Sequence, residues 1–119
     1  MGKHNEFGKQ GEDVAVRFLE KQQYAILARN YRYLKAEVDI IAQKGGVLAI
    51  VEVKSRNSDF LEDLTAVIGR KKIELLIAAA NQYVLEYDLE VDIRFDLITV
   101  IRRNGKFELE HLEDAFYHF

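Results

Sequence analysis

The sequence contains no cysteine and no proline, and it has no long uncharged hydrophobic run. Without cysteine the chain has no disulfide bond and no thiolate to bind zinc or act as a nucleophile. This composition fits a reducing compartment. The first twelve residues have no apolar run suited to a signal peptide, and no uncharged stretch reaches the roughly 18 residues of a membrane span. We therefore expect a soluble cytoplasmic protein without a membrane segment.

Charge of one sign is not in large excess either. The 17 Lys and Arg residues and 20 Asp and Glu residues give a formal net charge of −3, whereas nucleic-acid-binding proteins usually have a basic excess. The distribution of charge is more informative than its sum, because residues 29–72 hold nine Lys or Arg and six Asp or Glu. The sequence therefore allows a modestly positive face around this segment.

The 119 residues, 49% hydrophobic and 31% charged, suit one globular domain spanning residues 1–119. There is no internal repeat or linker. Apolar residues recur at helical spacing in two segments, and five others are rich in β-forming residues. The pattern predicts an α/β domain of order α-β-β-β-α-β-β, with elements at about residues 5–22, 24–34, 37–44, 47–54, 64–87, 91–102 and 106–113.

A two-residue turn at Gly45–Gly46, between two apolar strands, predicts a β-hairpin whose register is set by the turn. In that register Asp39 lies directly opposite Glu52, with Cα atoms about 4.5 Å apart. Glu37 and Lys54 form the next pair, two residues further from the turn. All four side chains project from one face, since residues two apart share a face of a strand. We expect the other face to be apolar, with Val38, Ile40, Val51 and Val53.

Two carboxylates placed directly opposite each other on a sheet repel. A divalent cation would compensate their charges, because hard cations bind oxygen ligands. The pattern therefore suggests Mg²⁺ held by Asp39, Glu52 and the main-chain carbonyl of Val53. Such an ion suits phosphodiester hydrolysis, since it lowers the pKa of a bound water and neutralises a phosphate oxygen. Lys54 could then orient the water or stabilise developing negative charge.

A structural interpretation of the same residues remains open. Glu37 and Lys54 could form a cross-strand ion pair, with Asp39 and Glu52 solvated at the edge of a sheet. Glu12 poses a similar choice, since it stands at the head of an apolar helical stripe. It is either a first-turn acid favoured by the helix dipole or a functional carboxylate.

An acidic residue on one strand followed by E-x-K on the next resembles the PD-(D/E)xK nuclease superfamily. The chain resembles more closely the YraN or UPF0102 family, which is similar to archaeal Holliday junction resolvases. The resemblance covers about residues 8–100 and implies a restriction-endonuclease-like α-β-β-β-α-β core, with helices flanking a mixed sheet and one extra C-terminal strand. The matching segments are GKQGEDVAVRFL, ILARNYR, EVDIIA, VEVKSR, the helix with Lys72, and RFDLITV.

The resemblance also implies roles for particular residues. Glu12 matches the first-helix glutamate of the resolvases, Asp39 and Glu52 the metal ligands, and Lys54 the catalytic lysine. The expected phosphate contacts are Lys72, Arg29 and Arg56, although the two arginines could equally serve surface solubility. Arg94 and Asp96 also match a family motif, but we favour an internal ion pair on their strand. The chain has Ala36 where the family usually has glycine, and a positive φ there would be strained.

Taken together, these features predict a Mg²⁺-dependent endonuclease that acts on branched or structured DNA, with Mn²⁺ as a substitute. A two-fold dimer would suit junction resolution, which needs two cuts. The net acidity favours a second candidate, a non-catalytic nucleic-acid-binding or adaptor module. A third is a protein-interaction domain using the aromatic tail, although Tyr117 and Phe119 more often close a core. We expect the three histidines, His4, His111 and His118, to be surface residues.

Overall fold

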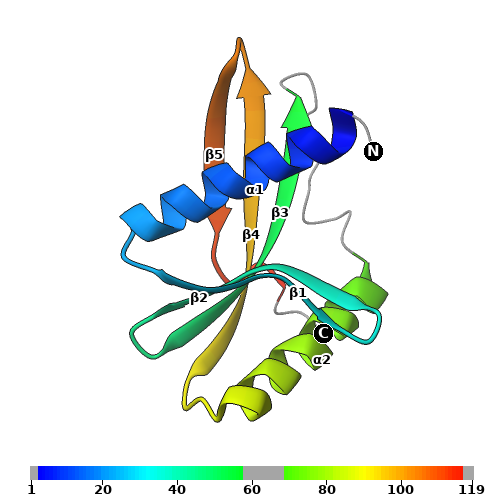
Figure 1. Cartoon of the computed structure of the whole chain (residues 1–119), viewed down its shortest axis with the longest axis vertical. Helices are drawn as coiled ribbons and strands as arrows, with labels where there is room; N and C mark the ends of the chain where they lie inside the picture. Colours follow the sequence, from blue (N-terminus) through cyan, green and yellow to red (C-terminus); the bar gives the residue numbers. More distant parts are fainter. Residues whose placement is uncertain (1–2, 58–68, 117–119) are drawn as a thin grey trace.

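The computed structural model describes residues 3–57 and 69–116 (Figure 1). Its helices and strands follow the predicted order α-β-β-β-α-β-β. They are α1 (Lys3–Lys21), β1 (Ala25–Tyr33), β2 (Ala36–Lys44), β3 (Val47–Asn57), α2 (Arg70–Tyr87), β4 (Asp92–Arg103) and β5 (Lys106–Leu112). No helix in these described ranges is long and apolar enough to cross a membrane.

The strands form one mixed sheet of order β1-β2-β3-β4-β5. Strands β3 and β4 are parallel and are connected through α2, and the other neighbouring pairs are antiparallel. Parallel strands need such a crossover connection, which a helix usually supplies. The expected fold class is therefore confirmed: an α-β-β-β-α-β core with one additional C-terminal strand.

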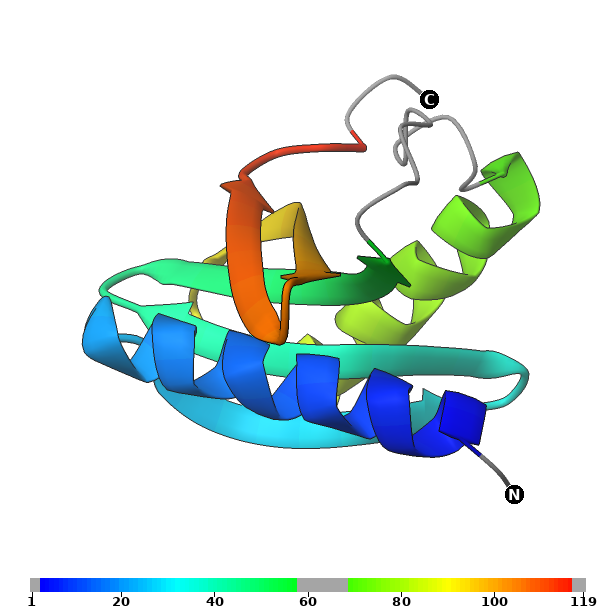
Figure 2. The ribbon, with the colours of Figure 1, turned by 90° about the horizontal axis from the view of Figure 1, so that it is seen from above.

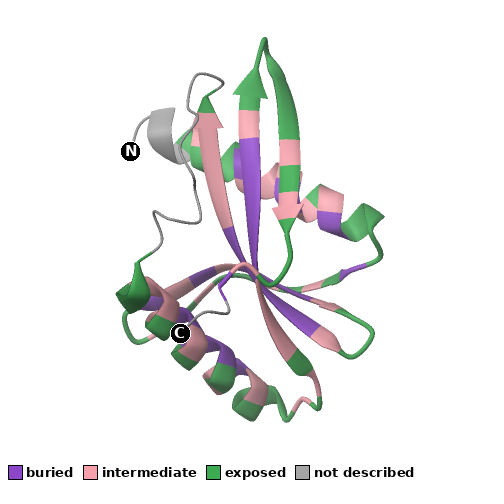
Figure 3. Ribbon diagram, turned by 180° about the vertical axis from the view of Figure 1, so that it is seen from behind, coloured by how far each residue is buried: buried purple, intermediate pink, exposed green. Residues whose placement is uncertain are grey.

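The two helices cover opposite faces of the sheet and divide the interior into two clusters (Figure 1, Figure 2). Helix α1 packs against β1, β3 and β4, whereas α2 packs against β1 and β2. The middle of the sheet is the most buried part, and the tip of the β4–β5 hairpin is exposed (Figure 3). Fully buried side chains of the sheet include Ile40, Ile41, Leu48, Ile50, Leu97 and Ile98. Such central strands are covered on both faces, as their apolar sequence requires.

Helix α1 approaches β3 closely at Gly11. A Cβ atom at this position would overlap the Ser55 hydroxyl group and lie 3.3 Å from Ser55 Cβ. Glycine therefore leaves room for the Ser55 side chain at this contact between α1 and β3. The contact matters for the site because it helps to set the position of Glu12, the next residue of α1.

The β2–β3 hairpin has the predicted register near its turn, from Lys44 opposite Val47 to Ile40 opposite Val51. The pairing ends there, one residue before the expected pairing of Asp39. Beyond this point β2 stays paired with β1 and turns away, while β3 continues beside β4 (Figure 1). The two strands therefore separate at the position where the acidic residues lie.

Near this separation, the side chains of β2 no longer alternate regularly between the two faces of the sheet. Val38 packs in the cluster beneath α2, together with Ile41, whereas Ile40 packs in the cluster beneath α1. The prediction that Val38 shares a face with Ile40 is therefore wrong. On the neighbouring strand, Asn30 has a left-handed backbone with φ of +54°, which interrupts the regular alternation beside Asp39.

Three other local expectations are settled by the backbone and the core. Helix α2 begins at Arg70, because Gly69 is extended with φ −75° and ψ 166°. The predicted start near residue 64 lies outside the described residues. Ala36 is paired in β2 without a positive φ, so the strain considered for it does not arise. Phe116 is buried in the core, whereas Tyr117 and Phe119 lie outside the described part of the chain.

Candidate metal and phosphate site

The candidate site lies where β2 and β3 separate. The carboxylate of Asp39 accepts a hydrogen bond from the main-chain N–H of Val53, with a distance of 2.8 Å to Oδ2. A side chain thus satisfies a backbone donor at the point where the strand ladder has ended. This contact directs the Asp39 carboxylate toward β3 and toward Glu52.

Asp39 and Glu52 form an unfavourable pair in this position. Burial, together with a hydrogen bond to Glu52 and the charge of Glu52, raises the pKa of Asp39 to about 8, although the Val53 N–H opposes the shift. Glu52 is only 3% exposed. Two carboxylates in one buried place cannot both remain charged unless a proton or a cation compensates them. The prediction that Asp39 lies directly opposite Glu52 in the strand pairing is wrong, because the pairing ends at Ile40 and Val51, but the two side chains still meet.

The cation beside Glu52 is Lys72, from the first turn of α2. Its Nζ lies 3.0 Å from Glu52 Oε2, and its side chain is 42% exposed. Glu52 Oε2 itself is buried and has no hydrogen-bond partner of acceptable geometry. Burial lowers the pKa of Lys72, but the close contact to Glu52 and the charges of Glu52, Asp39 and Glu37 together outweigh it and leave that pKa above its ordinary value. In the structure Lys72 contacts Glu52, a predicted metal ligand, and its contact with phosphate stays a prediction.

A pocket of about 350 Å³ opens beside Asp39, between the first half of α1 and the end of β3. It brings together three of the four predicted catalytic residues, Glu12, Asp39 and Lys54, whereas Glu52 is not part of its lining. The residues that line it are Phe7, Gly8, Glu12, Asp39, Val53, Lys54, Ser55 and Arg56.

Lys54 is half-buried in this pocket and has no ion pair within residues 3–57 and 69–116. Glu37, its expected cross-strand partner, is bonded instead to Arg32, with 3.1 Å between Nε and Oε2. The prediction that Glu37 faces Lys54 is therefore wrong, because β2 has already left β3 and pairs Glu37 with Arg32 of β1. The alternative built on a Glu37–Lys54 ion pair fails with it.

Glu12 is held by residues of β1. Its Oε1 accepts hydrogen bonds from Arg29 Nε at 2.9 Å and from Asn30 Nδ2 at 3.1 Å. Arg29 also donates to Asp13 at 2.7 Å, and these two carboxylates raise the pKa of the guanidinium. Arg29, predicted to contact phosphate, thus binds the carboxylates of α1. Among the described residues, no group of three or more His, Asp or Glu is placed to hold a metal ion together.

Arg56, the other arginine predicted to contact phosphate, does line the pocket. Its Nη1 donates a hydrogen bond to the main-chain carbonyl of Ser55 at 2.9 Å. Arg56 and Lys54 therefore place two cationic side chains around the same opening.

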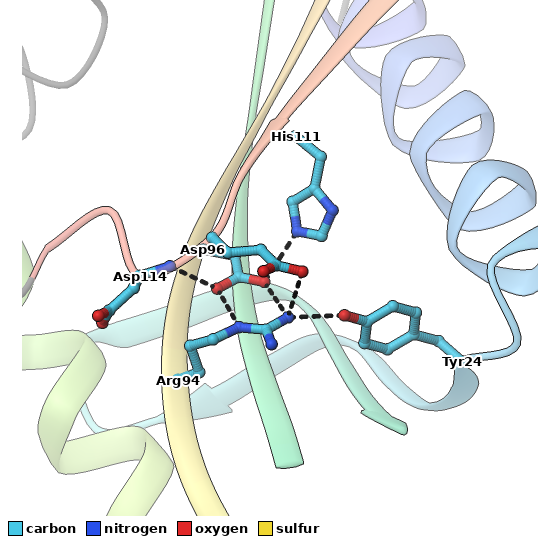
Figure 4. A network of polar contacts seen from close by, with 6 residues as sticks. Tyr24, Arg94, Asp96, His111 and Asp114 are labelled. Carbon is cyan, nitrogen blue, oxygen red and sulfur yellow. Dashed lines mark hydrogen bonds and ion pairs between the residues drawn. The ribbon is translucent and has the colours of Figure 1, made fainter. Parts of the chain in front are cut away.

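A second polar cluster lies near the other end of α1 (Figure 4). The fully buried Asp96 accepts hydrogen bonds from Arg94 and from the main-chain N–H of Asp114, and it contacts His111 at 2.8 Å. The internal Arg94–Asp96 ion pair is confirmed. His111 is not a surface residue as predicted, since its side chain is 11% exposed. The Asn104–Gly105 turn sets the β4–β5 register, and this register places His111 near Asp96. The turn was therefore the sequence signal that could have predicted the position of His111.

The fold and site define a mixed α/β domain with a half-buried and a buried carboxyl side chain, Asp39 and Glu52, where two neighbouring strands of its sheet separate. A model of the uncharacterised protein family UPF0102 matches residues 11–100. The chain is 50% identical over 119 residues to a UPF0102 protein of Flavobacterium psychrophilum and 44% identical over 119 residues to one of Christiangramia forsetii, with 100% of each chain covered in both cases. It is 42% identical over 117 residues to one of Bacteroides thetaiotaomicron, over 98% of this chain and 97% of the relative. The chain belongs to the UPF0102 family.

The donor atoms of the site fit a hard divalent cation. Asp39 and Glu52 supply carboxylate oxygens, which Mg²⁺ and Mn²⁺ prefer in proteins. Glu52 Oε2 is a buried acceptor without a hydrogen bond, and buried polar atoms of that kind usually have a partner. The part of the Val53 carbonyl as a third ligand stays a prediction.

Proposed function

We propose that this protein is a Mg²⁺-dependent endonuclease that hydrolyses phosphodiesters in branched or structured DNA. The observation that carries the proposal is the pair of half-buried Asp39 and buried Glu52, whose charges need compensation, beside a pocket that also holds Lys54. The resemblance to Holliday junction resolvases supports the choice of substrate. Mn²⁺ is expected to replace Mg²⁺.

Asp39 and Glu52 would hold the ion. When bound, Mg²⁺ would neutralise a phosphate oxygen and lower the pKa of a water molecule. The Val53 N–H keeps Asp39 in place through its hydrogen bond to Oδ2. Glu12 lines the same pocket, and its bond to Arg29 fixes its orientation; its negative charge adds to the attraction for a cation.

Lys54 would act on the substrate side of the pocket. Because no described residue forms an ion pair with it, its ammonium group can donate to a phosphate oxygen or to the attacking water. Donors that are placed before the reaction stabilise the charge that develops in the transition state. Arg56 lines the same opening and is placed to contact a neighbouring phosphate.

A second candidate is a non-catalytic nucleic-acid-binding or adaptor module on the same fold. Two observations favour it. The described residues hold no cluster of three metal-ligating side chains, and Glu12 is already bound by Arg29. Such a module would bind DNA in a salt-dependent manner without cutting it.

Labelled four-way junctions, flaps and linear duplexes, incubated with the protein in Mg²⁺ or in EDTA, separate the two candidates. The nuclease proposal expects metal-dependent cleavage that Asp39→Asn abolishes. Asp92→Asn is the matched control, because Asp92 is an exposed carboxylate at the start of β4. Wild-type protein that binds these DNAs but leaves all of them intact in Mg²⁺ and Mn²⁺ would leave the binding module as the function.

A further inference from the structure

The first turn of α2 carries three consecutive cations, Arg70, Lys71 and Lys72, and no acidic residue. Cations are disfavoured at the N-terminus of a helix, where the helix dipole is positive. The N-cap residue, Gly69, has no side chain that could cap the helix. Of the three cations, Lys72 is the one whose ammonium group contacts Glu52, and this contact compensates its unfavourable position.

We propose that Lys72 holds the place of a divalent cation on Glu52, that metal binding displaces its ammonium group, and that the displaced lysine then contacts a phosphate of the substrate. This inference rests on the proposed function, because it concerns the same acidic pair. It describes how the site couples metal binding to substrate binding.

The geometry of Glu52 makes the two cations exclusive. Lys72 Nζ lies 3.0 Å from Oε2, and that oxygen is buried without any hydrogen bond. A divalent ion bound to the same oxygen would stand within a few ångströms of the ammonium group, and like charges at such a distance in a buried site repel strongly. Lys72 therefore has to leave Glu52 when an ion binds there.

The side chain of Lys72 is able to leave. It is 42% exposed, whereas the Glu52 side chain is 3% exposed, so the ammonium group has direct access to water and the carboxylate does not. Lysine is a strongly hydrated point charge on a flexible side chain, so its ammonium group can exchange the contact to Glu52 for water. Within the described residues Lys72 has no other ion pair.

The exchange has two linked consequences. In the absence of metal, Lys72 neutralises Glu52 and competes with any arriving cation. In its presence, the displaced ammonium adds one positive charge that can contact phosphate. Coupling between two ligands is reciprocal, so metal should strengthen substrate binding through Lys72 and substrate should strengthen metal binding by the same factor.

Calorimetric titration with Mn²⁺ tests the competition directly. We expect Lys72→Met to lower the dissociation constant for Mn²⁺ by about tenfold, since couplings between close charges reach that size or more. Lys71→Met is the matched control, because it removes the same charge from the same helical turn, where Lys71 is exposed, and should change the constant by less than about twofold. Lys72→Gln tests loss of charge with a second side chain, and melting curves in EDTA verify that each variant is folded.

Binding of a four-way junction in EDTA and in Ca²⁺ tests the second consequence. Lys72→Met should weaken binding about threefold to tenfold in Ca²⁺ and much less in EDTA, because Lys72 is engaged by Glu52 without metal. Equal weakening in both conditions would contradict the exchange.

The possible failures are distinguishable. If wild-type protein binds no Mn²⁺, both the metal-dependent function and the role of Lys72 are overturned. If wild-type protein binds Mn²⁺ through Asp39 and Lys72→Met binds it no more tightly, the role of Lys72 alone is overturned and the proposed function stands.

Discussion

At the scale of single residues, the site depends on how the charges of Asp39 and Glu52 are compensated. Glu52 is buried and contacts one cation, Lys72, while Asp39 is half-buried and has a pKa of about 8. Near neutral pH one proton and one ammonium group therefore compensate two carboxyl groups. One divalent ion would compensate the charges of both carboxylates. The pair of carboxylates therefore suits a metal site better than it stabilises the fold.

The raised pKa of Asp39 predicts how stability depends on pH without metal. The folded protein retains a proton on Asp39 that the unfolded chain releases above about pH 4. The stabilisation from this proton is complete below about pH 4 and is lost as the pH rises through about 8. In EDTA, the free energy of unfolding should therefore fall by about 1–3 kcal/mol between pH 6 and pH 9 because of this group.

Urea unfolding of wild type and Asp39→Asn over this pH range measures the effect. Asparagine can accept the Val53 N–H and donate to Glu52, as the protonated acid does, so the variant should lack this part of the pH dependence. Parallel pH profiles for the two proteins would show that Asp39 is ionised throughout.

Lys54 provides a prediction about activity rather than stability. Lys54→Ala should lower the cleavage rate by about 100-fold or more, the usual cost of removing a donor to the transition state. The dissociation constant for Mn²⁺ should change little, because Lys54 lines the pocket without pairing to Asp39 or Glu52. Loss of rate together with loss of Mn²⁺ binding would instead indicate a distorted metal site.

At the scale of secondary structure, each helix brings one charged residue to the separated strands. Helix α1 brings Glu12 and α2 brings Lys72, from opposite faces of the sheet (Figure 1). The position of α1 depends on its close approach to β3 at Gly11.

Gly11→Ala should therefore destabilise the protein by about 1–3 kcal/mol, as overpacking usually does. Its Cβ would meet the Ser55 side chain, which would have to rotate its hydroxyl group and give way at Cβ. Gly8→Ala is the control on the same helix, where nothing lies within 4 Å of the added atom. It should stabilise the protein by about 0.5–1 kcal/mol through helix propensity. Thermal unfolding of both variants measures the contrast, and similar effects would contradict close packing at Gly11.

The cluster around Asp96 links β4 to β5 and to the end of α1. Burial disfavours the charge on Asp96, but the contacts from His111, Arg94 and the Asp114 N–H outweigh it and hold its pKa below the ordinary value. Asp96→Asn should cost about 3 kcal/mol at neutral pH, since it removes the buried charge partner of Arg94 and leaves only the longer contact to the exposed Glu113.

The sign of the pH dependence is opposite to that of Asp39. The stabilisation from ionised Asp96 is present above the unfolded pKa, near about 4, and is lost as the pH falls through its lowered folded value. The difference in unfolding free energy between wild type and Asp96→Asn should therefore shrink in acid. A difference that is constant from pH 7 to pH 3 would contradict an ionised Asp96.

The elements themselves were largely predictable because short-range rules determine them. The Gly45–Gly46 turn sets the pairing from Lys44 to Ile40, and Asn104–Gly105 does the same for β4 and β5. The end of β2–β3 pairing was not predictable in this way. It depends on the left-handed backbone of Asn30 and on which helix covers each part of the curved sheet, and neither follows from alternation along one strand.

At the scale of the whole molecule, the site results from strand separation between two helices (Figure 2). A regular hairpin would have placed Asp39 opposite Glu52 and Glu37 opposite Lys54. Because the strands separate, Asp39 accepts a hydrogen bond from the Val53 N–H, and Glu37 pairs with Arg32. Lys54 lines the pocket. The acidic pair was foreseen from the register. The ion pair between Lys72 and Glu52 was not, because it depends on how α2 docks onto the sheet.

The proposed function depends on Asp39 and Glu52 binding a divalent cation together. Crystals grown in EDTA and then soaked in Mn²⁺, with anomalous diffraction recorded at the manganese edge, would show this binding. We expect an anomalous peak within about 2–2.5 Å of carboxylate oxygens from both residues, with Lys72 Nζ moved away from Glu52. Absence of a peak at millimolar Mn²⁺, with the Lys72–Glu52 contact intact, would contradict it.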